Sequence, residues 1–198
     1  DKILTEWFSE DFIIVDFEFT SWKGSFENNW KKLNEYREIV QMGAIKVTNK
    51  DNELILYDTL DILVRPKINP VLSQYFIKLT GIKQDLVDKN GSDFKKALEV
   101  LKKFVNDTSI ILCNGNDGEI LRENCVLNQI KIPKWTNKFY NFRPYMSKIS
   151  GINPNNFISS DLPRLVGLSD AIKPHTGLDD CKSILRVFNY WKSSGNLN

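Results

Sequence analysis

The chain has 198 residues, which is long enough to bury a sizeable core, and we expect a single domain over residues 1–198. The hydrophobic share of 41% and the charged share of 26% are ordinary for a globular protein, and a formal net charge of +2 excludes a uniformly basic coat. No stretch approaches the ~20 apolar residues of a membrane span, and residues 1–10 lack a signal-peptide pattern. We therefore expect a cytoplasmic protein, and its first residue, Asp1, is compatible with trimming or with a longer parent chain.

The three cysteines, Cys113, Cys125 and Cys181, are expected to be reduced and buried. Their number is odd and no two of them have Cys-x-x-Cys spacing, so neither a disulfide framework nor a redox motif is indicated. Because the chain has only one histidine, the cysteines also make a poor ligand set for zinc.

The first part of the chain predicts three strands in a row. They cover residues 12–19, 39–47 and 53–64. The first is an apolar run interrupted by Asp16 and Glu18, which is typical of a buried central strand. A turn at 49–52 joins the other two, and the polar segment 21–36 is expected to be a long loop with a helical turn around 30–33. Three consecutive strands favour an antiparallel meander.

After the third strand the pattern changes to helices that alternate with short strands. Pro66 and Pro70 end the strand pattern, and apolar spacing over 93–105 predicts a helix with Ser92 as its cap. Short strands are expected at 109–113 and 138–142. Further helices are expected at 71–79, 116–127, 160–166 and 176–191. This alternation favours parallel strands, so the expected fold class is α/β, with a mixed central sheet flanked by helices.

Asp16 and Glu18 lie two residues apart on the expected central strand, so their carboxylates point to the same face. Burying two carboxylates in an apolar strand is costly unless a cation neutralises them, and one hard cation could be held between them. Without a cation they would repel each other, and one of them would tend to stay protonated. The alternative is a strand edge on which both acids are solvated.

Asp117 follows the expected strand at 109–113 and lies at the start of the next expected helix. In α/β sheets ligands gather at the carboxyl ends of strands, so an acid here could reach a metal held by the first strand. The alternative is that Asn116 or Asp117 caps the helix by accepting its free amides. The local sequence does not decide between these two interpretations.

His175 is the only histidine in the chain, and Asp180 follows it five residues later. Thr176 and Asp179 fit a Thr-x-x-Asp variant of the capping box, which makes Asp179 the structural acid. Asp180 lies about 100° around the helix from Asp179 and is therefore the candidate ligand. A lone histidine is more often a packed or surface residue, but beside several acids it can serve as a general base. The set points to metal-assisted hydrolysis of a phosphodiester.

Taken together, these residues resemble the motifs of the DEDDh exonuclease superfamily in order and spacing. The matching residues are Asp16-Phe17-Glu18, then Asp117 with Leu121, then His175 with Asp180. Further segments are similar to the Eri-type branch of that superfamily, which consists mostly of RNA exonucleases. These segments are 16–22, 38–44, Val64-Arg65-Pro66, Asn69-Pro70, 79–82 and 175–180. The resemblance extends from about Phe12 to Trp191.

The resemblance implies a ribonuclease H-like fold and a 3′→5′ exonuclease that releases nucleoside 5′-monophosphates. It also implies two Mg²⁺ or Mn²⁺ ions, with His175 as the general base. The implied metal ligands are Asp16, Glu18, Asp117 and Asp180. All-oxygen ligands suit these ions and disfavour zinc. Two ions can stabilise both the attacking and the leaving oxygen, and a histidine with an unperturbed pKa near ~6.5 can take a proton from the attacking water.

Contacts to the 3′-terminal nucleotide are also implied, from residues just after the first motif and from the Leu-Thr-Gly-Ile segment. In this chain they are Phe19, Thr20, Trp22, Leu79 and Thr80. Stacking of a base on an aromatic ring contributes ~1–3 kcal/mol without reading sequence. For Phe19 and Leu79 the alternative is plain core packing.

The loop after the first strand interleaves basic and aromatic residues, namely Lys23, Lys31, Lys32 and Arg37 with Trp22 and Trp30. Such a loop could guide a single strand, or it could be solvated with Trp30 folded onto the body.

The leading expectation is an enzyme that acts on single-stranded RNA or on short 3′ overhangs. A DNA exonuclease of the proofreading type is the main alternative, because no residue is an evident sensor of the 2′-OH. A nucleic-acid-binding module without catalysis is a second alternative, although it would not need costly buried carboxylates. The sequence specifies no oligomeric state.

Overall fold

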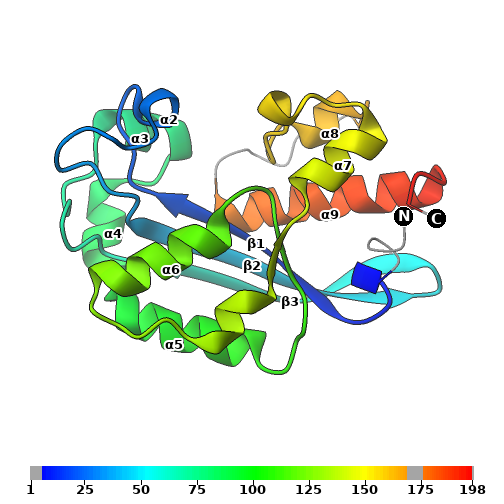
Figure 1. Ribbon diagram of the computed structural model, residues 1–198, viewed down its shortest axis with the longest axis horizontal. Coiled ribbons are helices and arrows are strands. Elements are labelled where there is room, and N and C mark those ends of the chain that lie inside the picture. The colour runs from blue at the N-terminus through cyan, green and yellow to red at the C-terminus, as the bar shows by residue number, and fades with distance from the viewer. Residues whose placement is uncertain (1–5, 169–175, 198) are drawn as a thin grey trace.

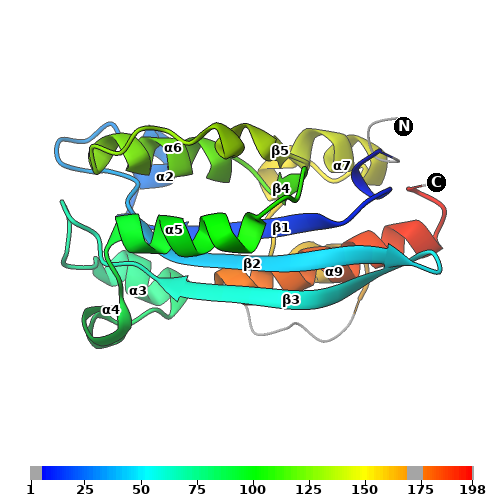
Figure 2. The same ribbon diagram turned by 90° about the horizontal axis from the view of Figure 1, so that it is seen from below.

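The computed structural model describes residues 6–168 and 176–197 and shows a five-stranded sheet in the order β3-β2-β1-β4-β5 (Figures 1 and 2). The strands are β1 (Phe12–Phe19), β2 (Ile39–Lys50), β3 (Glu53–Leu63), β4 (Ile111–Cys113) and β5 (Phe139–Asn141). β1, β2 and β3 pair antiparallel, whereas β4 is parallel to β1 and β5 is parallel to β4. The predicted mixed sheet, a meander continued by parallel strands, is confirmed.

Helices cover both faces of the sheet (Figures 1 and 2). The long helix α9 (Gly177–Ser193) packs on β1, β2 and β3, with α7 (Arg143–Ser150) and α8 (Leu162–Leu165) beside it. α5 (Phe94–Val105) and α6 (Asp117–Leu127) cover the other face. The remaining helical segments are short: α2 (Ser25–Asn28), α3 (Gln74–Thr80), α4 (Gln84–Asn90) and 3₁₀ turns at Lys134–Lys138 and Pro154–Asn156. α2, α3 and α4 lie at the end of the sheet toward which β1 points (Figure 1).

The two faces of β1 belong to two different hydrophobic cores. Phe12 and Ile14 pack with residues of α9, whereas the residues that alternate with them pack with α5 and α6. Because side chains alternate along a strand, Asp16 and Glu18 continue the row that starts with Phe12 and Ile14. Both carboxylates therefore face the side of the sheet that carries α9.

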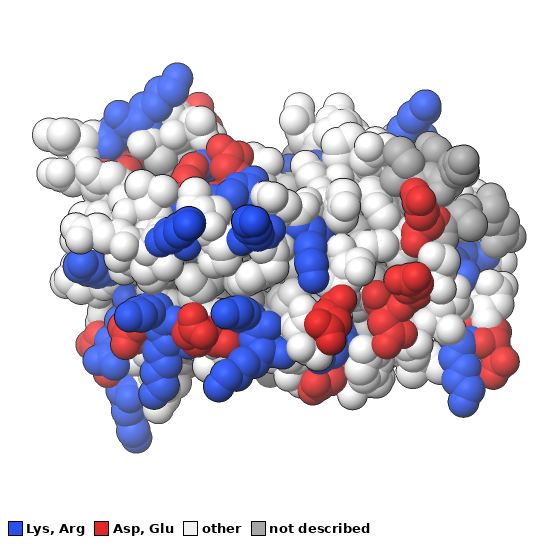
Figure 3. All heavy atoms as spheres, turned by 60° about the horizontal axis from the view of Figure 1, so that its bottom comes forward, with Lys and Arg blue, Asp and Glu red and all other residues white. Residues whose placement is uncertain are grey.

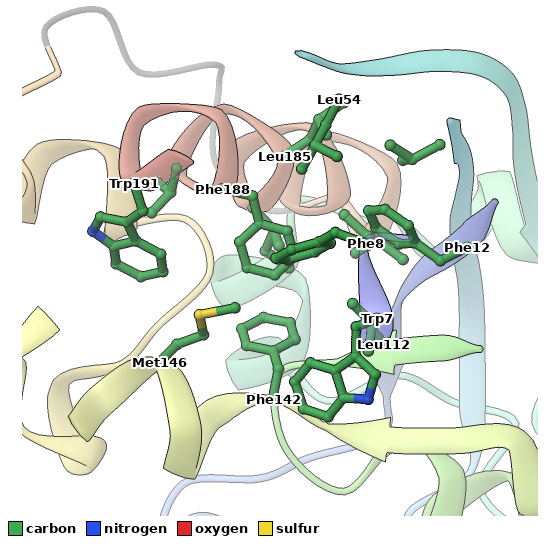
Figure 4. Packing of buried hydrophobic residues seen from close by; sticks show 14 of the residues in the cluster. Trp7, Phe8, Phe12, Leu54, Leu112, Phe142, Met146, Leu185, Phe188 and Trp191 are labelled. Atoms are coloured by element: carbon green, nitrogen blue, oxygen red, sulfur yellow. The ribbon is translucent and has the colours of Figure 1, made fainter. Parts of the chain in front are cut away.

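An aromatic core holds α9 against the sheet (Figure 4). Phe188 of α9 packs edge-on against Phe8 and Phe142, with ring centroids 5.4 Å and 5.0 Å away. Trp191 follows on the same helix and is 2% exposed. Full burial of a large apolar side chain contributes about 1.5–3 kcal/mol, so these rings anchor α9 and thereby determine where its first turn lies.

Some predicted boundaries in the first half of the chain are wrong for local reasons. The hairpin turn is narrower than 49–52 and consists of Asp51 and Asn52, whose φ angles of 51° and 66° are those that a two-residue hairpin needs. The helical turn predicted at 30–33 is found at α2 instead.

Two helices begin at other residues than predicted, because the residue whose side chain caps a helix determines where that helix begins. Asp93, not Ser92, caps α5, since its carboxylate accepts the N–H of Lys96 at 2.9 Å. Ser73 caps α3, which therefore begins later than residue 71. α4 and α7 were not predicted, because neither carries a long apolar repeat.

The three cysteines are in the state that the sequence predicts, and the charged side chains of both signs are mixed on the surface. Cys113, Cys125 and Cys181 are buried and not disulfide-bonded, as predicted. On the face shown in Figure 3, Lys and Arg side chains are interspersed with Asp and Glu. In the part of the chain that the structure describes, no helix combines the length and the apolar character needed to cross a membrane.

Candidate active site

Three carboxylates from distant parts of the chain converge near the end of β1. Asp16 and Glu18 extend from β1, and Asp180 extends from the first turn of α9. One oxygen from each of them lies within 4.8 Å of the other two, and Asp180 is 8% exposed. Carboxylate oxygens held this closely are the ligands that hard divalent cations prefer, and they suit zinc poorly. The donor set therefore fits Mg²⁺ or Mn²⁺.

Asp117 brings a fourth acid to the same cavity. It is the first residue of α6, is 6% exposed, and accepts the backbone N–H of Phe17 on Oδ1 at 2.9 Å. Phe17 lies between Asp16 and Glu18 in β1, so this bond fixes Asp117 beside the acid pair. Asn116 occupies the N-cap position of α6 without a side-chain hydrogen bond, which disfavours the capping interpretation for that residue.

Asp179 and Asp180 are adjacent in the first turn of α9, but their carboxylates have different surroundings. The hydroxyl of Thr176, the N-cap, accepts the N–H of Asp179 at 3.2 Å and donates to Oδ2 of Asp179 at 2.8 Å. Asp179 is thus tied to the helix cap, as the capping pattern predicted. Asp180, the next residue, lies instead with the two acids of β1.

Two glycines let α9 approach the sheet closely enough to bring the third acid into place. A methyl group added at Gly43 of β2 would lie 2.2 Å from the carbonyl carbon of Gly177, and one added at Gly177 would lie 2.3 Å from the backbone oxygen of Asp16. Gln41 completes this contact, because it accepts the N–H of Gly177 at 2.9 Å and donates to Asp61 at 2.9 Å. The close packing of α9 on β1 and β2 depends on both glycines lacking a side chain.

Burial and mutual repulsion raise the pKa values of the clustered acids. Burial, followed by the charges of the neighbouring carboxylates, raises the pKa of Asp16 and that of Glu18 well above their usual ranges. Burial raises the pKa of Asp117 to about 6, although the N–H of Phe17 and the charge of Arg143 oppose the shift. Without a cation the folded cluster therefore binds protons more tightly than the unfolded chain does.

This linkage predicts that a divalent cation stabilises the protein more at high pH than at low pH. In EDTA, the contribution of the cluster to stability is present below the ordinary carboxyl pKa of ~4 and is lost as the pH rises through the raised pKa values, about 6 for Asp117. A divalent cation held by the ionised acids would reverse this loss. We expect Mg²⁺ to raise the melting temperature more at about pH 8 than at about pH 5.

Thermal unfolding with EDTA or Mg²⁺ at the two pH values measures this effect. Asp16→Asn is the control, because it removes one clustered charge and should reduce the difference between the two pH values. An equal Mg²⁺ shift at both pH values in the unchanged protein would contradict the linkage.

The acids line a cavity of about 660 Å³, which is within the usual size of a ligand site. Phe19 and Leu79, two of the predicted substrate contacts, line the same cavity, and Leu79 is 37% exposed. Trp30 also lines it and donates from its indole nitrogen to the carbonyl of Thr20 at 2.8 Å. The interpretation in which Trp30 folds onto the body therefore matches the structure.

The structure does not bring the other predicted substrate contacts to this cavity. Thr20, Trp22 and Thr80 are not among its lining residues. The hydroxyl of Thr20 donates to the carbonyl of Tyr36 and accepts the N–H of Glu38, just before β2. The hydroxyl of Thr80 bonds to the backbone of α3 and of the turn that follows it. Both hydroxyls are used within the fold, and the contact of Thr20, Trp22 and Thr80 with a substrate stays a prediction. His175, the predicted general base, lies outside the described residues.

Polar residues that the sequence reasoning missed support the acids. Ser159 donates to Asp16 at 3.3 Å and accepts the side-chain amide of Asn114 at 2.9 Å. Arg143 lines the cavity and donates to the side-chain and backbone oxygens of Asn114 at 2.9 Å and 2.7 Å. Asn114 follows β4 and Arg143 lies just beyond β5. Because ligands gather at the carboxyl ends of parallel strands, the positions of these two residues after the predicted strands were a signal for the site. Ser159 carries no such signal.

A family model described as Exonuclease (RNase T) matches residues 13–188. The chain belongs to this exonuclease family. Within it, 3′-5′ exoribonuclease 1 of Rattus norvegicus is 29% identical over 182 residues, which are 88% of this chain and 50% of that protein. The probable 3′-5′ exonuclease KapD of Bacillus subtilis is 29% identical over 184 residues, 89% of this chain and 82% of KapD. The chain spans about half the length of the curated exoribonucleases it matches.

A solved relative in this exonuclease family has the same fold. The nuclease domain of 3′hExo, described as a DEDDh family member bound to rAMP, matches with a TM-score of 0.79 at 26% identity, covering 95% of this chain and 94% of that domain. The predicted ribonuclease H-like fold is confirmed. The predicted resemblance to Eri-type DEDDh exonucleases is confirmed as well.

Proposed function

We propose that this protein is a metal-dependent 3′→5′ exonuclease that hydrolyses single-stranded RNA or short 3′ overhangs to nucleoside 5′-monophosphates. The observation that carries the proposal is the convergence of Asp16, Glu18 and Asp180 within 4.8 Å in a chain that the exonuclease family matches over residues 13–188. A cluster of carboxylates that are partly or fully buried costs free energy, and metal-assisted hydrolysis is a function that requires such a cluster.

The proposed metal ligands are the four acids Asp16, Glu18, Asp117 and Asp180, which would hold two Mg²⁺ or Mn²⁺ ions. Bound ions would stabilise the charge that develops on the attacking and leaving oxygens of the phosphodiester. The contribution of the chain itself is to hold the carboxylates together against their repulsion. The N–H of Phe17 and the hydroxyl of Ser159 do this by donating to Asp117 and Asp16.

The proposed general base is His175, which would take a proton from the attacking water. An unperturbed imidazole has a pKa near ~6.5 and can accept a proton at neutral pH. His175 directly precedes Thr176, the cap of the helix that carries Asp180. This place in the chain supports its role beside the acids.

Phe19 and Leu79 are proposed to contact the 3′-terminal nucleotide. Phe19 directly follows Glu18, and both Phe19 and Leu79 line the cavity of the acids. An aromatic ring in this place can stack on any base, which suits an enzyme that shortens strands of mixed sequence.

RNA is the proposed substrate because of the names of the relatives. The rat relative is named an exoribonuclease, and the 3′hExo nuclease domain is described as bound to rAMP. KapD is named an exonuclease without reference to RNA. DNA is therefore the competing substrate, and the experiment has to compare the two.

Two 5′-labelled single-stranded oligonucleotides of identical sequence, one RNA and one DNA, test the proposal. Each is incubated with the protein and Mg²⁺ or Mn²⁺, with EDTA as the control. We expect a ladder that shortens from the 3′ end, faster for RNA than for DNA, and no ladder in EDTA. Absence of shortening in both nucleic acids with both metals would contradict the proposal and favour a binding module without catalysis.

The close approach of α9 to the sheet predicts that Gly177→Ala lowers both stability and turnover. A methyl group 2.3 Å from the backbone of Asp16 forces the helix or the strand to shift. Overpacking of this kind costs ~1–3 kcal/mol, and a misplacement of about 1 Å near the reacting groups can cost ~10²-fold in rate. Urea denaturation and turnover per folded molecule are the measurements.

Gly151→Ala is the matched control for this variant. Its added methyl meets no atom within 4 Å, but its φ of 71° disfavours a side chain, so it should cost stability and leave turnover unchanged. Equal losses of turnover in the two variants would mean that the contact between α9 and β1 is not what positions Asp180.

A further inference from the structure

An aromatic cluster extends the cavity away from the acids. Phe19, Phe26 and Trp30 all line the cavity, with ring centroids 6.4 Å, 5.4 Å and 4.8 Å apart for the three pairs. Phe19 directly follows Glu18 in β1, whereas the other two rings come from α2 and the turn after it. Phe26 is 53% exposed, so the cluster runs from the acids out to solvent.

Trp30 is held in place against its backbone preference. Its φ of 53° lies in the left-handed region, which a bulky side chain adopts at a cost in free energy. Three contacts compensate: its indole nitrogen donates to the carbonyl of Thr20 at 2.8 Å, the Arg37 guanidinium carbon lies 5.8 Å from its ring centroid, and Phe26 packs edge-on at 4.8 Å. Glu123 in turn holds Arg37 by two hydrogen bonds. A ring fixed from several sides is preorganised for a ligand.

Phe26 leaves apolar surface in water at the edge of this cavity. Its ring packs on Trp30 at an interplanar angle of 69°, so its remaining surface is available for contact. Leu33, in the same loop, is 90% exposed but does not line the cavity. Phe26 is therefore an exposed side chain that also lines the cavity, whereas Leu33 is exposed away from it.

The lining of the cavity also includes polar side chains that suit a sugar–phosphate chain. Arg143 lines the cavity together with several asparagines, and groups of this kind can donate hydrogen bonds to phosphate and sugar oxygens. The asparagines are Asn29, Asn116, Asn141 and Asn155, whereas the amide of Asn114 donates to Phe157 and Ser159 within the fold. Aromatic rings and such polar groups in one cavity favour a single-stranded nucleic acid over a peptide as occupant.

We propose that Phe26 and Trp30 form a stacking surface for the base that precedes the 3′-terminal nucleotide. This inference rests on the proposed exonuclease function, because the terminal phosphodiester has to reach the acids beside Phe19. The preceding base then lies toward the outer rings. Every base has a π-face, so the surface binds without sequence preference and favours substrates of at least two nucleotides.

Binding of adenosine 5′-monophosphate and of the dinucleotide 5′-pApA isolates the contribution of this base. All proteins carry Asp180→Asn to prevent cleavage, and both ligands are titrated in Mg²⁺ by calorimetry. We expect pApA to bind about 5- to 150-fold more tightly than the mononucleotide. Phe26→Ala should remove most of that ratio, Phe26→Tyr should keep it, and Leu33→Ala, the control in the same loop, should leave it unchanged.

The outcomes separate this inference from the function on which it rests. A ratio that is the same with and without Phe26→Ala, or a parent protein that binds pApA no more tightly than the mononucleotide, would overturn the stacking surface. Either result leaves the exonuclease proposal standing if the unchanged chain shortens labelled RNA. If the unchanged chain shortens no 3′ end and the Asp180→Asn protein binds neither ligand, both proposals fail together.

Discussion

The Asp180→Asn variant is expected to shorten no 3′ end, whereas Asp179→Asn is expected to keep its activity and lose only stability. Asp180 shares the 4.8 Å cluster with Asp16 and Glu18, so the change removes a charged ligand from the proposed metal site. Asp179 accepts the hydroxyl of Thr176 at 2.8 Å at the cap of α9. Loss of a negative charge at a helix N-terminus costs ~0.3–1 kcal/mol.

The two variants form a matched pair, since the same chemical change is made at neighbouring residues. The labelled-RNA assay measures turnover, and urea denaturation measures the free energy of unfolding. The reverse pattern, with activity lost in Asp179→Asn and kept in Asp180→Asn, would show that the capping argument selected the wrong aspartate.

The His175→Ala variant is expected to keep its fold and most of its metal affinity but to lose ~10²–10⁴-fold in turnover. The side chain is proposed to act on the proton of the attacking water, and the four acids that are proposed to bind metal remain. The loss should therefore appear in kcat, with the Mg²⁺-dependent rise in melting temperature preserved.

The pH dependence of the rate distinguishes a general base from a structural residue. With His175 present, we expect the rate to fall below a pH near ~6.5, where an imidazole becomes protonated. In His175→Ala this fall in rate at low pH should be absent, and added imidazole should restore part of the rate. Wild-type turnover in the variant would exclude His175 as the base.

Local patterns predicted the parts of the fold that local physics determines. The apolar run of β1 has the same bounds in the structure as in the prediction, because its burial and alternation are properties of the segment itself. The cap of α9 was also predicted, since Thr176 and Asp179 interact within one turn. The choice of Asp180 as the candidate ligand followed from the capping pattern of Thr176 and Asp179 and from helix geometry.

The remaining features depend on contacts between residues far apart in the sequence. Ser159 donates to Asp16, which lies far away in the sequence, and the sequence around neither residue predicts that hydrogen bond. Trp30, a partly buried loop residue, reaches the cavity through a backbone with a φ of 53°, which its residue type does not favour. Thr20 and Thr80 were expected at the substrate because of their neighbours in the sequence, but their hydroxyls serve the backbone of the fold.

The order of the elements along the chain has a consequence for the time at which the acids meet. Asp16, Glu18 and Asp117 are synthesised early, but Asp180 belongs to α9, which follows every described strand of the sheet. The first turn of α9 lies against β1, and the same helix carries Phe188 of the aromatic core. A chain in which α9 has not yet been synthesised therefore lacks Asp180, and the proposed metal site stays incomplete until that helix is added.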